Sequence, residues 1–419
     1  VCGGGSAGFI AAICAARSGL RTALVERFGF LGGTAISGYV APISGFFKKG
    51  RQVVGGIPFE FVGRMEALGG AKVEYPRGHV SFDPEIYKLV AARMVHEAGV
   101  ELYTNSYITD CVVHDGRVSE IIIENKNGAE ALRAACVIDA TGDADLCRMA
   151  GMDFLPANPD GLQPLSMCFV IGGVDLTTPL LCDCIHHDGR VPRSVNDVIR
   201  KMLGEAYKNG EVPQFGGPWF NSLECGDLVA VNVTRAAADA CDNRALRDAE
   251  LRLREDMFTL FEKMKQTYPE FRNGHIVSSA VVAGVRETRH IRGCHTLCGE
   301  DFLGGRTYPD SIALASHPVD IHSMKDASQK LTSLAEAAQI PYGCLVSDKC
   351  RNVICAGRCI SADTVAFASI RVQATCMAIG QAAAVAAGVF RDAGEGAHVA
   401  HIDTDELISR LHAVGGITE

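Results

Sequence analysis

The sequence predicts an α/β protein whose parallel β-sheet is assembled from two distant parts of the chain. Three short apolar strands that each run into a glycine-containing turn carry this prediction. They lie in Val1–Gly8, Val137–Asp143 and Asn352–Ser361. In doubly wound sheets such turns lie at the carboxyl ends of parallel strands, where these folds bind their ligands. The long stretch between the second and third strands contains no such turn, and we expect it to form an inserted α+β domain.

The first of these turns has the most specific pattern. A G-x-G-x-x-G sequence is formed by Gly3, Gly5 and Gly8. It precedes a predicted helix over Phe9–Ala16 and a strand over Leu20–Val25, and Glu26 follows 18 residues after the last glycine. The glycines permit a tight turn, close approach to a pyrophosphate and close packing of helix on strand. The helix N-terminus attracts phosphates, and Glu26 would accept hydrogen bonds from ribose hydroxyls. This unit predicts dinucleotide binding.

The opening strand is unusually short. Only Val1 and Cys2 precede the first glycine, whereas strands of roughly five residues are usual. We therefore expect that a few native residues precede Val1.

Local patterns predict the next elements. Residues 36–80 are rich in glycine and proline and are expected to be irregular. The segment Ser81–Glu85 caps a helix that runs to Glu97, with Pro84 at a tolerated early position. Asp115 and Gly116 form a dipeptide typical of a tight hairpin turn. Strands are predicted at Val100–Tyr103, Tyr107–His114, Val118–Glu124 and Cys136–Ala140.

The second half divides into an inserted region and a return to the nucleotide-binding domain. Strands are predicted near Ser166–Ile171, Asp227–Asn232 and Ile276–Ala283, and a charged amphipathic helix over Asn243–Thr267. The helix Thr375–Val389 is apolar on all sides, which indicates burial. We expect a nucleotide-binding domain in two parts, an inserted domain between them and a C-terminal tail helix. Their ranges are 1–150, 341–395, 151–340 and 396–419, and the tail helix lies near Asp403–His412.

Composition excludes several classes of protein. The chain has 419 residues, 47% of them hydrophobic, and a net charge of −9. Lysine and arginine form no block, so we expect no nucleic-acid partner. No apolar stretch of about 18 residues lacks a charge or turn signal, so we expect no membrane association. The 17 cysteines indicate reduced thiols and a cytoplasmic location. Their spacings, including the run Cys182–His187, match no zinc or iron–sulfur site, so we expect no metal.

Taken together, these motifs resemble the FAD-dependent oxidoreductases of the glutathione-reductase-like superfamily. More narrowly, the chain resembles a bacterial FAD-dependent oxidoreductase family whose members are largely uncharacterised. The segments that carry the resemblance through the middle of the chain are Asn232–Arg235, Gly284–Gly293, Pro318–His322, Ile340–Val346 and Ala356–Ser361. The resemblance implies an enzyme with FAD as cofactor and a discontinuous Rossmann-type FAD-binding domain. It also implies that the inserted α+β domain binds substrate.

The resemblance also assigns residues to the cofactor. The glycine turn and the first helix residues would hold the pyrophosphate, and Ile108 would lie against adenine. The start of the last long helix would lie beside the flavin, where its dipole would stabilise negative charge. The full predicted cofactor set is Gly3, Gly5, Ser6, Ala7, Gly8, Glu26, Arg27, Gly32, Gly33, Thr34, Ile108, Ala140, Gly142, Gly357, Arg358, Ile370, Arg371 and Val372.

Three residues are candidates for catalysis. Arg286 lies in an Arg-rich segment with Arg289 and would contact substrate or flavin, the alternative being a pair with Glu287 or other nearby acids. His322 follows Asp320 by two residues, so an aspartate could orient the imidazole as a general base. The alternative is a structural histidine. Tyr342 lies at the return into the cofactor domain, where it contacts either substrate or the domain interface.

The reaction class follows from what the flavin motifs include and omit. No second G-x-G-x-x-G for a nicotinamide cofactor is present, and Phe28–Ala35 contains no redox cysteine pair. Either the organic substrate or an external electron carrier would therefore reduce the flavin. We expect hydride transfer between flavin N5 and a small polar organic substrate. The alternatives are a flavin-bearing electron-transfer subunit that serves a partner protein, and a flavin monooxygenase. The sequence is compatible with a homo-oligomer.

Overall fold

The centre of the molecule is a layer of parallel strands. The computed structural model describes residues 1–419 apart from residues 75–77, 159–160, 183–194 and 324–328. Cys2 pairs with the strand on each side of it. On one side lie β1 (Ala23–Val25) and then β6 (Glu101–Tyr103), and on the other β10 (Val137–Asp139) and then β19 (Val353–Cys355). The predicted parallel sheet is present, and the N-terminal segment lies at its centre.

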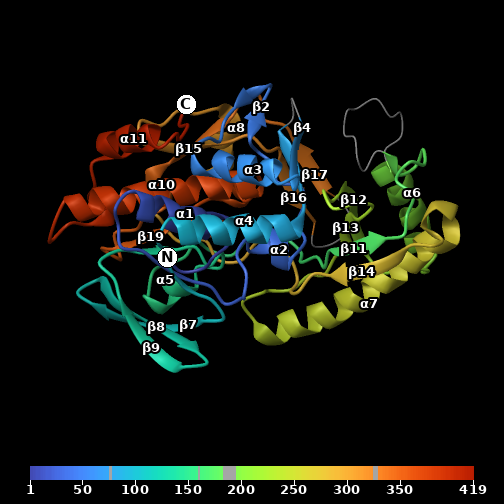
Figure 1. Ribbon diagram of the computed structural model, residues 1–419, viewed down its shortest axis with the longest axis horizontal. Helices are drawn as coiled ribbons and strands as arrows, with labels where there is room; N and C mark the ends of the chain where they lie inside the picture. Colours follow the sequence, from blue (N-terminus) through green and yellow to red (C-terminus); the bar gives the residue numbers. More distant parts are fainter. Residues whose placement is uncertain (75–77, 159–160, 183–194, 324–328) are drawn as a thin grey trace.

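Two helices of small residues pack together against this layer. They are α1 (Ser6–Arg17) and α10 (Gln373–Asp392) (Figure 1). Their backbones approach closely because a Cβ atom on Gly380 would lie only 2.1 Å from the carbonyl oxygen of Ala7. By length and composition α10 could cross a membrane, but 94% of its apolar window is buried inside the protein. The burial predicted for Thr375–Val389 is thus confirmed.

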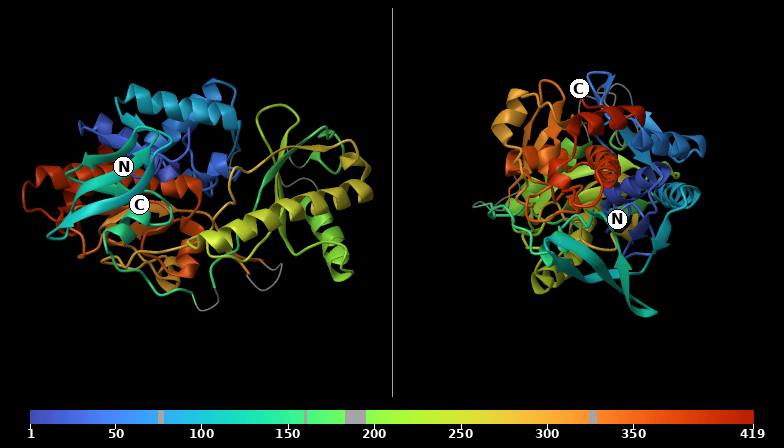
Figure 2. Two further views of the ribbon diagram at one scale, coloured as in Figure 1. Left: turned by 90° about the horizontal axis from the view of Figure 1, so that it is seen from below. Right: turned by 90° about the vertical axis from the view of Figure 1, so that its left-hand side faces the viewer.

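A second sheet, fully antiparallel, lies at the other end of the molecule (Figures 1 and 2). Its strands, in spatial order, are β12 (Phe215–Ser222), β13 (Val229–Thr234), β11 (Phe169–Gly172) and β14 (His275–Ser279). Helices α6 (Val195–Lys208) and α7 (Asn243–Thr267) pack on it through an apolar cluster of its own. All of these elements come from the region that the sequence predicts to be inserted.

The remaining elements surround the parallel layer and connect it to the second sheet. A three-stranded antiparallel sheet is formed by β7 (Tyr107–His114), β8 (Arg117–Asn125) and β9 (Gly128–Arg133). The other helices are α2 (Thr34–Ser37), α3 (Ile57–Ala67), α4 (Pro84–Glu97), α5 (Asp145–Met149), α8 (Gly299–Gly304), α9 (Thr364–Ile370) and α11 (Thr404–Ala413). The other strands form pairs, namely β2 (Phe47–Lys48) with β3 (Arg51–Gln52), β4 (Ala71–Glu74) with β5 (His79–Phe82), β15 (Ser311–Ala315) with β18 (Ala338–Pro341), and β16 (Val319–His322) with β17 (Gln329–Thr332).

One sequence expectation about the fold is wrong. The composition of residues 36–80 predicts an irregular segment, yet this segment includes α3 and short paired strands. Pro58 lies in the first turn of α3, where a missing N–H costs nothing. The helix then buries Phe61 and Met65 in the main core. Proline therefore starts a helix in a segment where its presence suggests a break.

Candidate functional site

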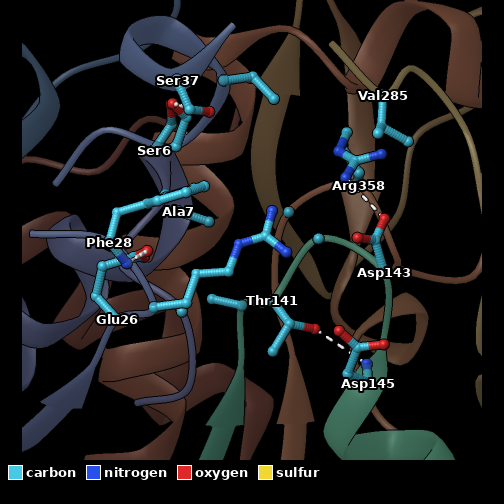
Figure 3. Close-up of a pocket in the computed structure, with 18 of the residues that line it drawn as sticks. Ser6, Ala7, Glu26, Phe28, Ser37, Thr141, Asp143, Asp145, Val285 and Arg358 are labelled. Atoms are coloured by element: carbon cyan, nitrogen blue, oxygen red, sulfur yellow. Dashed lines mark hydrogen bonds and ion pairs between the residues drawn. The ribbon is translucent and has the colours of Figure 1, made fainter. Parts of the chain in front are cut away.

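A long pocket crosses the carboxyl ends of the parallel strands (Figure 3). The pocket and its mouth together enclose about 1190 Å³ of space. Figure 3 shows Ser6, Ala7 and Glu26 on one wall and Asp143 and Arg358 on the facing wall. The first wall comes from the N-terminal β-α-β unit, and the second from turns that follow β10 and β19. Parts of the chain far apart in sequence therefore build one site.

The glycine turn forms one wall because no other residue fits there. Gly3 has a φ of +92°, which other residues rarely adopt. A Cβ atom on Gly8 would lie 1.8 Å from the carbonyl oxygen of Gly3, so helix α1 can start only where a glycine allows this contact. The N-cap Gly5 offers no side-chain cap, so the first turn of α1 faces the pocket with backbone N–H groups. This is the arrangement that binds a phosphate.

Glu26 lies at the end of β1 and is almost fully buried. Its Oε2 accepts a hydrogen bond from Gly4 N at 2.6 Å, and its Oε1 accepts one from Phe28 N at 2.8 Å. Burial raises the pKa of this carboxyl, and the two backbone hydrogen bonds oppose that shift. Each carboxylate oxygen has a second lone pair, so the oriented group can still accept hydrogen bonds from a ribose.

The facing wall is held by an ion pair. Arg358 Nη2 lies 2.9 Å from Asp143 Oδ1, and the same oxygen accepts a hydrogen bond from the Thr288 hydroxyl. The adjacent turn is fixed by Asp139, which accepts hydrogen bonds from Thr141 N and Thr141 Oγ1. Arg358 Nη1 is buried and has no hydrogen-bond partner among the described residues. Such a donor is available for an anionic ligand.

The N-terminus of α10 contributes the last part of the lining. Arg371, Gln373 and Cys376 all line the pocket there. Arg371 Nη2 donates a hydrogen bond to the carbonyl oxygen of Asp320 at 2.8 Å, whereas its Nη1 is buried and unpartnered within the described part of the chain. Burial lowers the pKa of Arg371 to about 10. Burial also raises the pKa of the Cys376 thiol to about 12, so this thiol is not a nucleophile at neutral pH.

His322 has two side-chain partners, of which the sequence predicts one. The predicted contact with Asp320 exists, with 2.9 Å between His322 Nε2 and Asp320 Oδ2. However, His322 Nδ1 lies 2.8 Å from Arg235 Nη2. A guanidinium can only donate, so Nδ1 accepts and Nε2 carries the proton given to Asp320. Burial, together with the nearby Arg286, lowers the pKa of His322 to about 3. Both ring nitrogens are occupied and the side chain does not line the pocket, so a general-base role is not supported.

The other two catalytic candidates also lie outside the pocket lining. Tyr342 is buried, and its hydroxyl donates a hydrogen bond to Val399 O at 2.8 Å, which makes it a core residue. Arg286 donates from Nη1 to Pro164 O at 2.6 Å and to Ser166 Oγ at 2.8 Å. It therefore secures the backbone beneath the site rather than pairing with Glu287. Its neighbour Arg289 forms an ion pair with Asp145 at 2.9 Å, as expected if the arginines of this segment pair with nearby acids.

Most of the predicted cofactor residues come together in the pocket. Those that line it are Gly3, Gly5, Ser6, Ala7, Glu26, Arg27, Gly33, Thr34, Ile108, Ala140, Gly142, Gly357, Arg358 and Arg371. Those that do not are Gly8, Gly32, Ile370 and Val372. Gly8 and Gly32 allow close packing behind the pocket wall. A Cβ atom on Gly32, for example, would lie 2.7 Å from the ring of Tyr87. Ile370 is wholly buried in the main core.

Sequence reasoning missed several lining residues. They include Phe28, Ser37, Tyr107, Thr141, Asp143, Val282, Val285 and Gln373. Asp143 could have been found because it directly follows the Gly142 turn. The sequence contains no signal that Val282 and Val285 line a pocket, because apolar residues in such a segment are equally typical of a hydrophobic core. The run Cys182–His187 falls largely outside the described residues, and elsewhere in the described chain no group of three His, Cys, Asp or Glu residues could hold a metal ion.

The fold and pocket are those of a dinucleotide-binding enzyme, and the comparisons with known proteins agree. A family model described as FAD dependent oxidoreductase matches residues 1–411. The chain therefore belongs to the FAD-dependent oxidoreductase family, as its motifs suggest.

Similar proteins fall among flavoenzymes. Digeranylgeranylglycerophospholipid reductase 2 of Methanothermobacter thermautotrophicus is 29% identical over 190 residues, which is 42% of this chain and 47% of that protein. The match thus spans about half the length of that relative. The flavin-dependent brominase Bmp2 has a TM-score of 0.51 at 13% identity, covering 98% of this chain and 81% of that one, and shows a shared fold. A geranylgeranyl bacteriochlorophyll reductase-like protein of Thermoplasma acidophilum has a TM-score of 0.48 at 14% identity, covering 99% and 81%.

The cofactor is FAD, and the residues of the pocket fit it. Backbone N–H groups of α1 face the space that a pyrophosphate needs. A Cβ atom on Gly33 would lie 2.8 Å from Gly5 Cα, so two glycine backbones leave room for a flat ligand between the walls. Glu26 provides acceptors for a ribose, and the unpartnered donor of Arg358 provides positive charge.

Proposed function

We propose that this protein transfers a hydride between FAD and a small polar organic substrate. Bound FAD supplies a two-electron carrier that can take up or give a hydride. The observation that carries the proposal is the continuous pocket, which begins at Glu26 and reaches the second sheet region at Val282 and Val285. Its far end therefore lies where two parts of the protein meet, which is a common place for substrates to bind.

We also propose a specific class for the FAD-binding domain and limits for each domain. The strand order, with the N-terminal segment central, supports a Rossmann-type, glutathione-reductase-like FAD-binding domain formed by residues 1–150 and 341–395. The antiparallel sheet with α6 and α7 supports an inserted substrate domain within 151–340. A cytoplasmic location, and an external carrier that completes the electron balance, belong to the same proposal.

In this assignment the protein residues position groups and manage charge. Ser6 and Ala7 bind through their backbone at the phosphates, and Glu26 orients the ribose. Arg371 holds positive charge at the start of α10, where the helix dipole adds to it. If the substrate is an alcohol, its C–H hydrogen would pass to bound FAD as a hydride, which carries both electrons, and the O–H proton would pass to solvent. The described lining of the pocket contains no histidine that could accept this proton.

The test is an anaerobic absorbance titration of protein loaded with FAD. A panel of alcohols, amines and acids is added first to the oxidised protein and then to protein reduced by dithionite. Bleaching by one compound, or reoxidation by one, supports hydride transfer and names the substrate. Protein that binds no FAD overturns the proposal. Protein that binds FAD but reacts with no small molecule, while exchanging electrons with a carrier protein, replaces it with the electron-transfer alternative.

A further inference from the structure

Buried arginines gather behind one end of the pocket. We define the arginine cluster as Arg235, Arg286 and Arg371 together with the carboxylates of Asp320 and Glu287. Arg235 is 2% exposed and contacts His322, and the side chain of Arg371 is 10% exposed. The charges of Asp320, Arg286, Glu287 and Arg358 all act on Arg371. Among the described residues, arginines and carboxylates thus share a region largely shielded from water, where uncompensated charge is costly.

The carboxylate nearest to Arg371 is already engaged. Asp320 Oδ2 accepts the proton of His322 Nε2 at 2.9 Å, and its Oδ1 accepts a hydrogen bond from Gln329 Nε2 at 2.6 Å. Arg371 reaches Asp320 mainly through the backbone carbonyl, because its distance to Oδ2 is 3.5 Å. The positive charge of Arg371 is therefore only partly balanced by Asp320.

Donors without partners lie on both sides of this cluster. Arg371 lines the pocket, and its Nη1 has no hydrogen-bond partner in the described chain. Gln163 accepts a hydrogen bond from His322 N through Oε1, which fixes its Nε2 as a second donor, and that atom is also buried and unpartnered. Near Arg371, Gln373 uses Nε2 to bind Val40 O, which leaves Oε1 as an unpartnered acceptor on the pocket wall. Leaving such groups unpaired is unfavourable.

We propose that Arg371 binds a carboxylate of the substrate, so that the protein acts on organic acids. This inference rests on the proposed function and names the substrate class. A guanidinium forms short, charge-assisted hydrogen bonds to a carboxylate. The unpartnered Nη1 of Arg371 is the donor that such a carboxylate would bind. A hydroxyl beside the carboxylate would find an acceptor in Gln373 Oε1.

The test measures binding rather than turnover. Protein loaded with FAD is titrated anaerobically with lactate, succinate and benzoate, and with the matching amides lactamide, succinamide and benzamide. Changes in the flavin spectrum and in the melting temperature report binding. We expect at least one acid to bind about tenfold or more tightly than its own amide, because the amide lacks the charge that Arg371 recognises. Lactate tests the added hydroxyl.

Variants assign the preference to Arg371. Arg371→Gln should bind the acid and its amide equally, whereas Arg371→Lys, which keeps the charge, should retain part of the preference. Arg391→Gln is the matched control, because Arg391 lies on the same helix but pairs with Asp392 at the surface. FAD affinity is measured for every variant, so that a loss of acid binding can be separated from a loss of FAD binding.

Each outcome decides the inference. If wild-type protein loaded with FAD binds no acid, or binds acids and amides alike, the inference is wrong while the proposed function stands. If Arg371→Gln weakens FAD binding as strongly as acid binding, Arg371 serves the flavin and the inference is wrong. If the wild-type protein binds no FAD, the proposed function fails first. If Arg371→Gln does not fold, the wild-type comparison and the Arg371→Lys variant still give the answer.

Discussion

Arg235 Nη2 lies 2.8 Å from His322 Nδ1 and thereby fixes the protonation state of the imidazole. Because the guanidinium donates, the ring must accept at Nδ1 and donate at Nε2, which is the neutral form. A third contact runs from the backbone N–H of His322 to Gln163 Oε1. His322, which the sequence presents as a candidate base, thus joins β16 to Arg235, the residue that follows β13.

The neutral state of His322 predicts a loss of stability in acid. Its pKa is about 3 in the folded protein and 6.5 for an ordinary histidine, so between these values the unfolded chain binds the extra proton. Stability is therefore complete above the ordinary value and falls as the pH falls towards 3. Between about pH 7.5 and about pH 5 the wild-type protein should lose more unfolding free energy than His322→Asn, by about 1–2 kcal/mol.

Urea unfolding at those two pH values measures this difference. Exposed His401, whose side chain is 70% exposed, provides the control variant His401→Asn, which should keep the wild-type dependence on pH. Asp320 acts in the same direction, because burial raises its pKa but the contacts with His322 and Arg371 outweigh burial and hold it below its usual value. Equal pH dependence in wild type and His322→Asn would show that His322 has an ordinary pKa in the folded state.

Glu26 should be needed for FAD affinity. In Glu26→Gln the amide group must face either Gly4 N or Phe28 N, so a favourable hydrogen bond becomes a contact between two donors. The ribose also loses a charged acceptor. We expect the Kd for FAD to rise about 10- to 100-fold, measured by quenching of flavin fluorescence. Glu97→Gln, on an exposed carboxylate at the end of α4, should bind FAD like wild type. An unchanged Kd in Glu26→Gln would place the ribose elsewhere.

Tyr342 should matter for stability and not for the reaction. Tyr342→Phe removes the hydroxyl that donates to Val399 O and leaves that buried carbonyl oxygen without this donor. The unfolding free energy should fall by about 1–2 kcal/mol, while turnover and the flavin spectrum stay at wild-type values. Tyr207→Phe, at an exposed position of α6, controls for loss of a tyrosine hydroxyl. A large fall in kcat at unchanged stability would make Tyr342 a catalytic candidate again.

Local chemistry is enough to predict some elements in full. The amphipathic pattern of Asn243–Thr267 predicts the whole range of α7, and the Asp115-Gly116 turn marks the end of the predicted strand β7. The glycine pattern likewise predicts the pocket wall made by α1. These features depend on residues that are close in sequence, so one segment contains the whole signal.

Other features depend on partners far away in the chain. His322 is held by Arg235, 87 residues earlier, and Arg371 by Asp320, 51 residues earlier. No local sequence pattern indicates which distant side chain or carbonyl group will become the partner of a given histidine or arginine. The same limit explains Tyr342, because its partner Val399 comes from the C-terminal tail. The cofactor wall can therefore be predicted, whereas the protonation and role of the catalytic candidates require the structure.

The same Gly→Ala substitution should have opposite effects on stability in two helices. The reason is that α1 packs on α10 at Gly380, whereas nothing in the described chain packs on Gly63. Gly380 and Gly63 both lie inside helices, so Gly→Ala gains about 0.5–1 kcal/mol from backbone entropy at either site. At exposed Gly63 a Cβ atom would meet nothing within 4 Å, and Gly63→Ala should stabilise the protein. At Gly380 the Cβ atom would lie 2.1 Å from Ala7 O, a backbone atom that cannot swing away. Helix α1 must then move, and we expect Gly380→Ala to cost about 1–3 kcal/mol.

The displacement should also reach the cofactor. Ala7 lines the pocket in the first turn of α1, so pushing its backbone shifts the N–H groups that face the pyrophosphate. Gly380→Ala should therefore raise the Kd for FAD as well as lower the urea midpoint, whereas Gly63→Ala should change only the midpoint, and upwards. If both variants gain stability and bind FAD normally, the two helices are not in backbone contact and the pocket does not depend on their crossing.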